Sequence, residues 1–290
     1  MMISGFTSHT ADVNGQTIVY ARAGSGPALL LLHGFPQTHA MWHEIAPDLA
    51  KDFTVITADL RGYGASSTPK GTHNYSFREM AADQLALMQS LGFETFHLVG
   101  HDRGGRTAHR LTLDYPKAVK TLTVLDIVPT HTLLSDLSHE VAKAYYHWFF
   151  LSQPSPMPEA MILADPDTYY ESCLLGWGAG VLSEFSPDAL EAYRQSWRRP
   201  HTIRAMCDDY RAAIEFDFDL DAADLHRQVA CPALVLFGAQ GKMAECYDVA
   251  GTWAPRLADM QAKAIPGGHF FPDTNPRDTI DALRAFLSRV

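Results

Sequence analysis

The chain has 290 residues, of which 47% are hydrophobic and 19% are charged, and its formal net charge is -10. This composition favours a large core and suits one α/β domain with an inserted subdomain. The negative charge argues against nucleic acid as a partner, and no basic run offsets it. The first residues lack a basic start followed by an apolar segment, and no stretch approaches the length of a membrane span. We therefore expect a cytoplasmic protein with no membrane association.

Cysteine and histidine usage gives no sign of a metal site or a disulfide framework. The chain has no C-x-x-C pair, and its widely spaced cysteines are typical of buried thiols in a reducing compartment. Fourteen histidines are present without an H-E-x-x-H pattern or other ligand spacing. We expect no disulfide, no metal and no other cofactor. The four cysteines are Cys173, Cys207, Cys231 and Cys246.

Short apolar runs alternate with helical patterns over the first part of the chain. A capping box begins at Ser76 with Glu79, and the apolar stripe that follows stops at Gly92, which predicts a core-facing helix. A second helix is expected at 41–50, and a third follows the corner at Gly104 and runs to Asp114. This alternation predicts a mostly parallel sheet flanked by helices. The expected strands are 18–21, 28–32, 54–57, 96–99 and 121–125.

The alternation breaks in the middle of the chain and then resumes. From about residue 129 to residue 224 the segments are helical, aromatic and punctuated by prolines, which predicts a helical cap domain. Strands are expected again at 233–237 and 260–265, with helices at 243–253 and after Asn275 and Pro276. We therefore divide the chain into a core domain, 1–128 and 225–290, and a cap domain, 129–224.

The stretch FHLVGHDRGGRT, residues 96–107, has the pattern of a nucleophile elbow between a strand and a helix. Gly100 and Gly104 lie two residues before and two after Asp102, where a tight turn leaves no room for larger side chains. Aspartate stands where hydrolases of this pattern usually carry serine. A carboxylate beside a helix N-terminus is kept ionised and can attack saturated carbon. The alternative for Asp102 is an ordinary N-cap or loop residue.

Two further residues complete a triad in the chain order nucleophile, acid, base. Asp126 follows the expected strand 121–125, and His269 follows the expected strand 260–265. The acid more often follows the strand at 233–237, but GAQGKMAEC offers no aspartate in its first turn. Asp248 is the fallback, disfavoured because we expect it inside the helix 243–253. A turn-capping role is the alternative for Asp126.

The loop His33-Gly34-Phe35-Pro36 directly follows the buried run ALLLL, where a hydrolase places one backbone donor of its oxyanion hole. We expect the backbone N–H groups of Phe35 and Arg103 to fill this role. Arg103 and Arg106 are also three residues apart at the elbow, so their planar guanidinium groups could clamp a carboxylate or neutralise nearby aspartates.

Over nearly its whole length the chain resembles the α/β-hydrolase-fold dehalogenases, most closely the fluoroacetate (haloacetate) dehalogenases. Their relatives, the haloalkane dehalogenases and epoxide hydrolases, usually carry tryptophan after the nucleophilic aspartate, where this chain has Arg103. The stretches that carry the resemblance are LLLLHGFPQTHAMW, TADLRGYGASS, NYSFREMAADQ, HLVGHDRGGRTAHRLTLDYP, VLDIVPT, YYHWFFLSQPSPMPE, GWGAG, CDDYRAA and PGGHFFPD.

The resemblance implies a hydrolase that converts haloacetates, fluoroacetate first, to glycolate and halide through an ester on Asp102. It assigns Arg103 and Arg106 to the substrate carboxylate. It also implies that donors in the cap stabilise the leaving halide, and it suggests a homodimer. The implied halide donors are His147, Trp148 and Tyr210, and Trp177 is a weaker candidate for lining the pocket.

Other functions are compatible with parts of the pattern. An epoxide hydrolase would use the same triad with cap tyrosines, for which Tyr145, Tyr146 and Tyr210 are candidates. A related haloalkane dehalogenase, or a small-molecule receptor on a hydrolase scaffold, are further alternatives. The pattern leaves open the preference among fluoro-, chloro- and bromoacetate.

Overall fold

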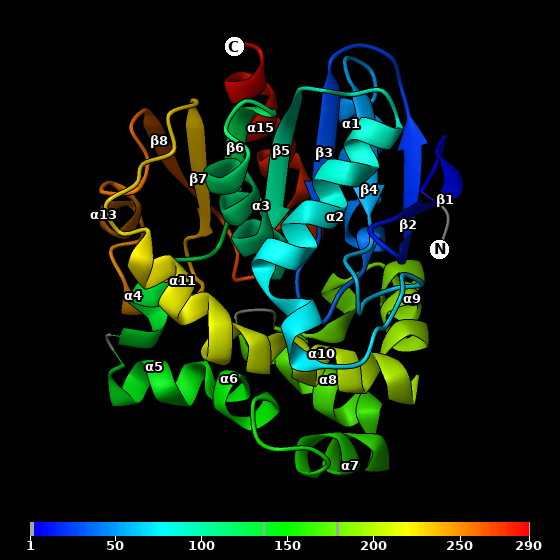
Figure 1. The fold of residues 1–290 in the computed structure, drawn as a ribbon, viewed down its shortest axis with the longest axis vertical. Helices are drawn as coiled ribbons and strands as arrows, with labels where there is room; N and C mark the ends of the chain where they lie inside the picture. Colours follow the sequence, from blue (N-terminus) through cyan, green and yellow to red (C-terminus); the bar gives the residue numbers. More distant parts are fainter. Residues whose placement is uncertain (1–2, 136, 178–179, 290) are drawn as a thin grey trace.

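The computed structural model describes residues 3–135, 137–177 and 180–289. Two residues of the GWGAG stretch, Gly178 and Ala179, lie outside the described residues. The centre of the molecule is a sheet of eight strands (Figure 1). They are β1 Thr7–Val13, β2 Gln16–Ala23, β3 Ala28–Leu32, β4 Thr54–Ala58, β5 Phe96–His101, β6 Val119–Leu125, β7 Ala233–Gly238 and β8 Met260–Ile265.

The strand order is β1-β2-β4-β3-β5-β6-β7-β8, in which β1 and β2 run antiparallel to their neighbours and the other strands are parallel. In the middle of the sheet, Leu31 of β3 pairs with Thr57 of β4 and Val99 of β5. Every residue of these three strands is buried, because helices cover both faces of a parallel sheet. The predicted parallel sheet is therefore confirmed.

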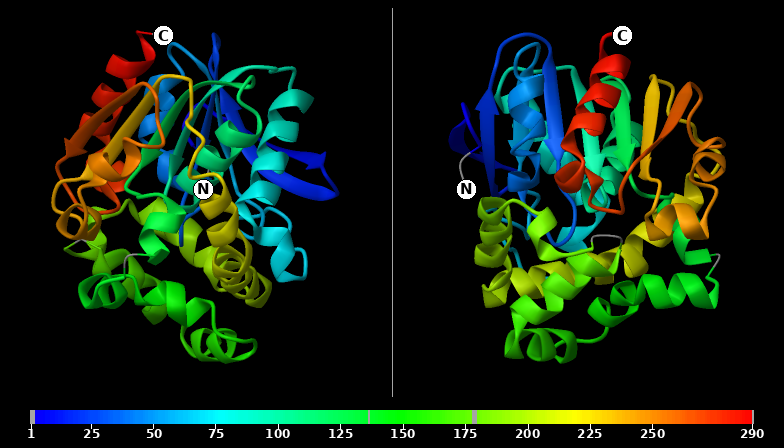
Figure 2. Two further views of the ribbon diagram at one scale, coloured as in Figure 1. Left: turned by 60° about the vertical axis from the view of Figure 1, so that its left-hand side comes forward. Right: turned by 180° about the vertical axis from the view of Figure 1, so that it is seen from behind.

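Helices α2 and α3 cover one face of the sheet, and α1 and α15 cover the other (Figures 1 and 2). Ser76 caps α2 as expected, since its hydroxyl accepts the Glu79 N–H at 3.3 Å. The helices outside the cap are α1 Ile45–Leu49, α2 Phe77–Ser90, α3 Arg103–Asp114, α12 Lys242–Cys246, α13 Val249–Trp253, α14 Phe271–Thr274 and α15 Pro276–Leu287, with 3-10 turns η1 His39–Trp42 and η2 Thr72–Tyr75.

A layer of helices between β6 and β7 lies across one end of the sheet (Figures 1 and 2). The side chains that follow β3, β5 and β8 contact this layer, so the carboxyl ends of the parallel strands face it. Its elements are α4 Thr130–Ser135, α5 His139–Ala144, α6 Tyr146–Leu151, α7 Met157–Ala164, α8 Pro166–Gly176, η3 Leu182–Glu184, α9 Pro187–Trp197, α10 Pro200–Ala212, the π-helical turn η4 Ala213–Asp217 and α11 Phe218–Ala223. Among the described residues, no helix combines the length and apolar character needed to cross a membrane.

Several predicted elements differ from the observed ones. Strand β1 was not predicted, because it is an edge strand with mostly exposed residues and so carries no apolar signal. The helix expected at 41–50 is instead η1 followed by α1. The helix expected at 243–253 is broken into α12 and α13, so Asp248 does not lie inside a helix. Asp248 is the N-cap of α13 and accepts the Gly251 N–H at 3.0 Å. Of the thiols expected to be buried, those of Cys231 and Cys246 are only half-buried.

Candidate active site

Asp102 lies at the corner between β5 and α3 with a left-handed backbone, at φ 46° and ψ -115°. Its two flanking glycines make this turn possible. A Cβ at Gly100 would lie 2.3 Å from the Gly104 carbonyl oxygen, and a Cβ at Gly104 would lie 2.4 Å from the His33 carbonyl oxygen. The elbow therefore needs glycine at both positions, and it directs the Asp102 side chain toward the end of the sheet beneath the cap.

The Asp102 carboxylate is buried, yet it is held in its charged form. Its Oδ2 accepts the backbone N–H of Phe35 at 2.9 Å, so the expected oxyanion donor contacts the carboxylate itself. Burial opposes ionisation, but neighbouring histidine and arginine side chains, His269 first among them, lower the pKa of Asp102 to about 2. The carboxylate is therefore ionised across the physiological pH range.

Asp126 and His269 meet as an acid and base pair next to Asp102. The His269 Nδ1 lies 2.6 Å from Asp126 Oδ2, and the second oxygen of Asp126 accepts the Gly238 N–H at 2.8 Å. Asp126 also has a left-handed backbone, with φ 52°. Burial works against the charged imidazolium, but the hydrogen bond and charge of Asp126 raise the pKa of His269 above its usual value. The three residues expected to form a triad are thus brought together, while Asp248 caps a helix elsewhere.

The guanidinium of Arg103 is largely occupied by a cap residue. Its Nε donates to Asp209 Oδ2 at 2.9 Å, and its Nη2 donates to both the carboxylate and the backbone oxygen of Asp209 on α10. Asp209 also accepts the Tyr63 hydroxyl at 2.6 Å. The planar edge that we expected to clamp a substrate carboxylate is therefore taken by Asp209, and Nη1 is the Arg103 nitrogen that has no partner among the described residues.

Arg106 is buried on the first turn of α3 and is held through one nitrogen. Its Nη1 donates to the Val128 carbonyl and to the Thr130 hydroxyl, both at 3.0 Å, while its Nε has no partner among the described residues. Burial lowers the pKa of Arg106 to about 10, so it remains a cation at neutral pH. The Arg103 and Arg106 guanidinium carbons lie 5.0 Å and 4.9 Å from the ring centre of Trp148.

Cap side chains supply further donors above Asp102. The His147 ring centre lies 5.3 Å from that of Tyr210, and the Trp148 and Tyr210 rings are also 5.3 Å apart. His147 Nδ1 and the Tyr210 hydroxyl are buried without a partner among the described residues. Burial lowers the pKa of His147 well below its usual value and raises that of Tyr210 well above it. Both side chains are therefore uncharged at neutral pH, and the Tyr210 hydroxyl keeps its proton.

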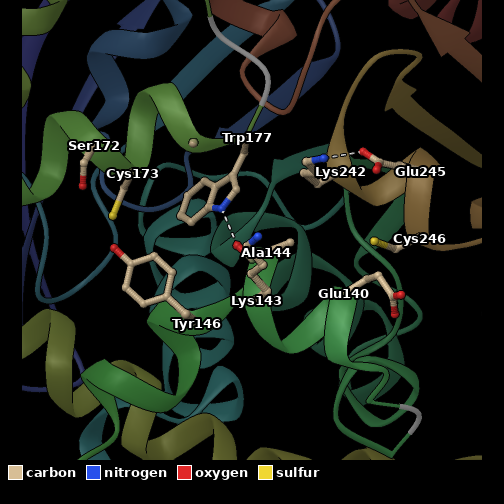
Figure 3. A pocket seen from close by; sticks show the side chains of 11 residues that line it. Glu140, Lys143, Ala144, Tyr146, Ser172, Cys173, Trp177, Lys242, Glu245 and Cys246 are labelled. Atoms are coloured by element: carbon tan, nitrogen blue, oxygen red, sulfur yellow. Dashed lines mark hydrogen bonds and ion pairs between the residues drawn. The ribbon is translucent and has the colours of Figure 1, made fainter.

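Trp177 separates this region from a pocket of about 430 Å³ between α5, α8 and α12 (Figure 3). On one side its ring lies 4.3 Å from that of His147 and 5.5 Å from that of His269. Its indole N–H donates to the Ala144 carbonyl at 2.8 Å, and its own carbonyl accepts the His269 backbone N–H at 2.8 Å. Trp177 thus forms a wall, and its N–H is not directed at the site.

Some pairings at and near the site could not be predicted from the sequence. Asp209 pairs with Arg103 across 106 positions, and Gln37 contacts Asp273 across 236 positions. Both aspartates stand in stretches that resemble dehalogenases, CDDYRAA and PGGHFFPD, but nothing local predicts their partners. Among the described residues, no group of three or more histidine, cysteine or acidic side chains is placed to hold a metal ion.

The fold and the site define a class of protein, and the similarity of the chain to known sequences and solved structures identifies this class. Residues 27–276 match the sequence profile of the alpha/beta hydrolase fold. A fluoroacetate dehalogenase from Burkholderia sp. is 56% identical, covering 99% of this chain and 95% of that protein. A soluble epoxide hydrolase from Corynebacterium sp. (strain C12) is 30% identical, covering 99% of both. The crystal structure of a candidate alpha/beta hydrolase from Nostoc sp. PCC 7120 superposes with a TM-score of 0.97, at 47% identity over all of both chains.

The predicted fold class is thereby confirmed, and so is the family resemblance. The chain belongs to the α/β-hydrolase-fold family and, within it, to the fluoroacetate dehalogenases.

Proposed function

We propose that the protein is a hydrolytic haloacetate dehalogenase that converts fluoroacetate and water to glycolate, fluoride and a proton. The observation that carries this proposal is the buried Asp102 carboxylate at the elbow, with Arg103 and Arg106 buried on the helix that follows it, in a chain 56% identical to a fluoroacetate dehalogenase. The epoxide hydrolase relative is more distant, at 30% identity. No cofactor takes part in this scheme.

In the first step, Asp102 attacks the carbon that carries the halogen, forming an ester bond while the carbon–halogen bond breaks and halide leaves with the electron pair. Because Phe35 N–H holds Oδ2, the other oxygen, Oδ1, is the nucleophile. The unpaired nitrogens of Arg103 and Arg106 bind the substrate carboxylate. His147, Trp148 and Tyr210 surround the departing halide. Two groups among them that have no partner among the described residues support this role: the Tyr210 hydroxyl, and His147 Nδ1, which donates in the tautomer that carries its proton there.

In the second step, water attacks the ester carbonyl. His269, held by Asp126, takes one proton from the water, and the ester oxygen leaves as the alkoxide of glycolate, which takes that proton back from His269. Asp102 is left as a carboxylic acid, and its ionisation releases the proton of the overall reaction. The ester carbonyl oxygen is Oδ2, which already faces Phe35 N–H. The negative charge that develops on this oxygen is thus stabilised by Phe35 and by the N–H of Arg103 at the start of α3.

The core and the cap contribute different groups to the proposed reaction. We propose that the core, 1–128 and 225–290, supplies the triad and the arginines, and that the cap, 129–224, supplies the halide donors. We also propose a homodimer, supported by apolar side chains exposed on the cap, such as Leu137, Ile214 and Phe216. A cytoplasmic location is part of the proposal, supported by the cysteine spacing.

An epoxide hydrolase is the second candidate, but the positions of its required tyrosines weigh against it. The Tyr145 hydroxyl contacts the Met243 sulfur at 3.9 Å, and the side chain of Tyr146 is exposed. Tyr210 is therefore the one of these three tyrosines whose hydroxyl is both buried and unpaired. Of these three tyrosines, one hydroxyl is therefore available to protonate an epoxide oxygen.

The direct test is a fluoride-selective electrode with purified protein and fluoroacetate, alongside a terminal epoxide assayed for diol. We expect fluoride and glycolate in equal amounts and no diol. Asp102→Asn, which keeps the size of the side chain and removes its charge, should abolish fluoride release while thermal unfolding stays close to wild type. Diol formation without fluoride release would replace the proposal by the epoxide candidate.

A further inference from the structure

Another buried carboxyl group, Asp273, lies at a junction of three segments around the site. It belongs to α14, which begins two residues after His269, and its backbone N–H donates to the Phe270 carbonyl at 2.9 Å. Its side chain accepts a hydrogen bond from the Gln37 amide, and the Tyr193 hydroxyl of cap helix α9 lies 3.2 Å from both of its oxygens. The junction therefore joins the loop that carries His269, the loop after β3 and the cap.

Gln37 connects this junction to the nucleophile. Its backbone N–H donates to the Gly34 carbonyl at 3.0 Å, which closes the turn that contains Phe35. Phe35 N–H in turn donates to Asp102 Oδ2. The Asp273 carboxyl thus ties the turn that carries the oxyanion donor to the helix that follows the base. These are the two groups that the proposed reaction needs for ester hydrolysis.

The surroundings of Asp273 contain neutral donors and no cation among the described residues. Tyr193 and Gln37 face it, and the charged group that acts on it is another acid, Glu44, which raises its pKa further. Tyr193 is itself buried, with its pKa raised well above the usual value by burial and then by Asp273. Burial raises the pKa of Asp273 to about 8. Hydrogen bonds from Tyr193 and Gln37 oppose this rise, but burial outweighs them. A carboxylic acid needs no partner charge, and the Tyr193 hydroxyl oxygen, 3.2 Å from both carboxyl oxygens, can accept its proton.

We infer that Asp273 is a positioning residue for ester hydrolysis and that it works as a neutral carboxylic acid, holding the Phe35 turn, the His269 loop and the cap in register. The inference rests on the two-step reaction proposed above. It assigns Asp273 no contact with the substrate. Its effect is on the placement of Phe35 N–H and of His269, and therefore on the second step more than on the first.

The kinetic test is Asp273→Ala, with Asp273→Asn as the isosteric neutral variant. Slowing ester hydrolysis lowers kcat and KM together and leaves kcat/KM unchanged, because kcat/KM reports events up to halide release. We expect kcat of Asp273→Ala to fall between about tenfold and 100-fold, since small misplacements of catalytic groups have such effects. Mass spectrometry should show the ester accumulating on the Asp102 peptide. Asp273→Asn should restore kcat to near the wild-type value.

Three results would overturn the inference: an unchanged kcat in Asp273→Ala, an equal fall of kcat and kcat/KM without ester, or an Asp273→Asn variant as impaired as Asp273→Ala. If Asp273→Ala does not fold, Gln37→Leu removes the hydrogen bond between Gln37 and Asp273 instead. This variant should also lower kcat and leave kcat/KM unchanged. An equal fall of both constants in that variant counts against the inference.

A second test does not depend on the reaction. A carboxyl with its pKa raised from 3.8 to about 8 contributes stability that is present below pH 3.8 and is lost as the pH rises to about 8. The ratio of the folding equilibrium constant of Asp273→Asn to that of wild type should therefore rise by up to about tenfold per pH unit between these values and stay constant at higher pH.

Denaturant midpoints from pH 5 to pH 9 measure this gain. Asp278→Asn is the matched control, because Asp278 lies on the next helix, α15, and pairs with the Asn275 side chain. If the difference in unfolding free energy between Asp273→Asn and wild type does not change with pH, or if Asp273→Asn does not fold, Asp273 is not a neutral acid in the folded protein. If fluoride release fails while the pH dependence is observed, the proposed reaction is wrong and the assignment of a neutral acid stands.

Discussion

Asp102 combines two properties that usually oppose each other, deep burial and a negative charge. Burial alone would protonate it, and an acid with a bound proton is a poor nucleophile. The surrounding positive groups reverse this effect and bring its pKa to about 2. His269 shows the same balance with the opposite sign of charge: burial opposes the imidazolium, but Asp126 raises the pKa of His269 and makes it a better base. The two steps of the reaction therefore depend on pH in different ways.

We predict that the two steps respond differently to acid. His269 must be neutral to accept a proton from water, so kcat should fall as the pH is lowered through its pKa. Asp102 of the wild-type enzyme stays ionised at the same pH values, so its single-turnover halide burst should be constant between about pH 5 and pH 8. Stopped-flow detection of halide and steady-state rates measure the two quantities. A burst that falls in parallel with wild-type kcat would place His269 in the first step.

At the scale of elements, the site is assembled where α3 of the core meets α6 and α10 of the cap. The bidentate pair between Arg103 and Asp209 joins α3 to α10, and the Tyr63 hydroxyl adds a third group from the loop after β4. Because Asp209 takes most of the Arg103 donors, Arg106 carries the larger part of the proposed carboxylate recognition.

Arg106→Leu should reduce kcat/KM for fluoroacetate by about 100-fold or more, because the substrate carboxylate would be buried without its main partner. Arg78→Leu is the control: it removes the same charge from α2, where Arg78 pairs with Asp114 at the surface, and should have little effect. Steady-state kinetics of both variants at one ionic strength make the comparison. Equal effects in the two variants would indicate a response to net charge instead of a specific contact.

Helix α10 also carries the hydroxyl of Tyr210, which has no partner among the described residues. Tyr210→Phe should slow fluoride release by about tenfold to 100-fold and bromide release much less, since fluoride is the stronger hydrogen-bond acceptor and the poorer leaving group. Single-turnover rates with fluoroacetate and bromoacetate measure this ratio. An equal loss for both substrates would assign Tyr210 to packing in the cap.

At the scale of the whole molecule, we predict a dimer of about twice the 32.1 kDa chain mass in light scattering after gel filtration. The exposed apolar side chains on the cap, including Ile214 and Phe216, are the proposed contact. Ile214 also lines a groove of about 200 Å³ together with the half-buried Phe218. Ile214→Asp should shift the dimer toward monomer, because a buried charge opposes association. Val181→Asp, on another exposed cap segment, should not. A wild-type monomer would remove this part of the proposal.

Much of this architecture could be predicted because it depends on local pattern. Buried strands such as β3 read as apolar runs, and the elbow around Asp102 reads from its glycines. The pairings that cross the molecule could not be predicted, since Asp209 and Asp273 find their partners only after folding. The break between α12 and α13 was missed because the cap provided by Asp248 is a weak signal within an apolar stripe.

The origin of the oxygen in glycolate tests the central claim, that Asp102 forms an ester that water then hydrolyses. In ¹⁸O-labelled water with enzyme in excess over fluoroacetate, the first turnover should give unlabelled glycolate, because its new oxygen comes from the Asp102 carboxylate. The label should appear in the peptide that contains Asp102, where mass spectrometry detects it. Labelled glycolate in the first turnover, with no label on Asp102, would mean that water attacks the haloacetate directly and would contradict the account.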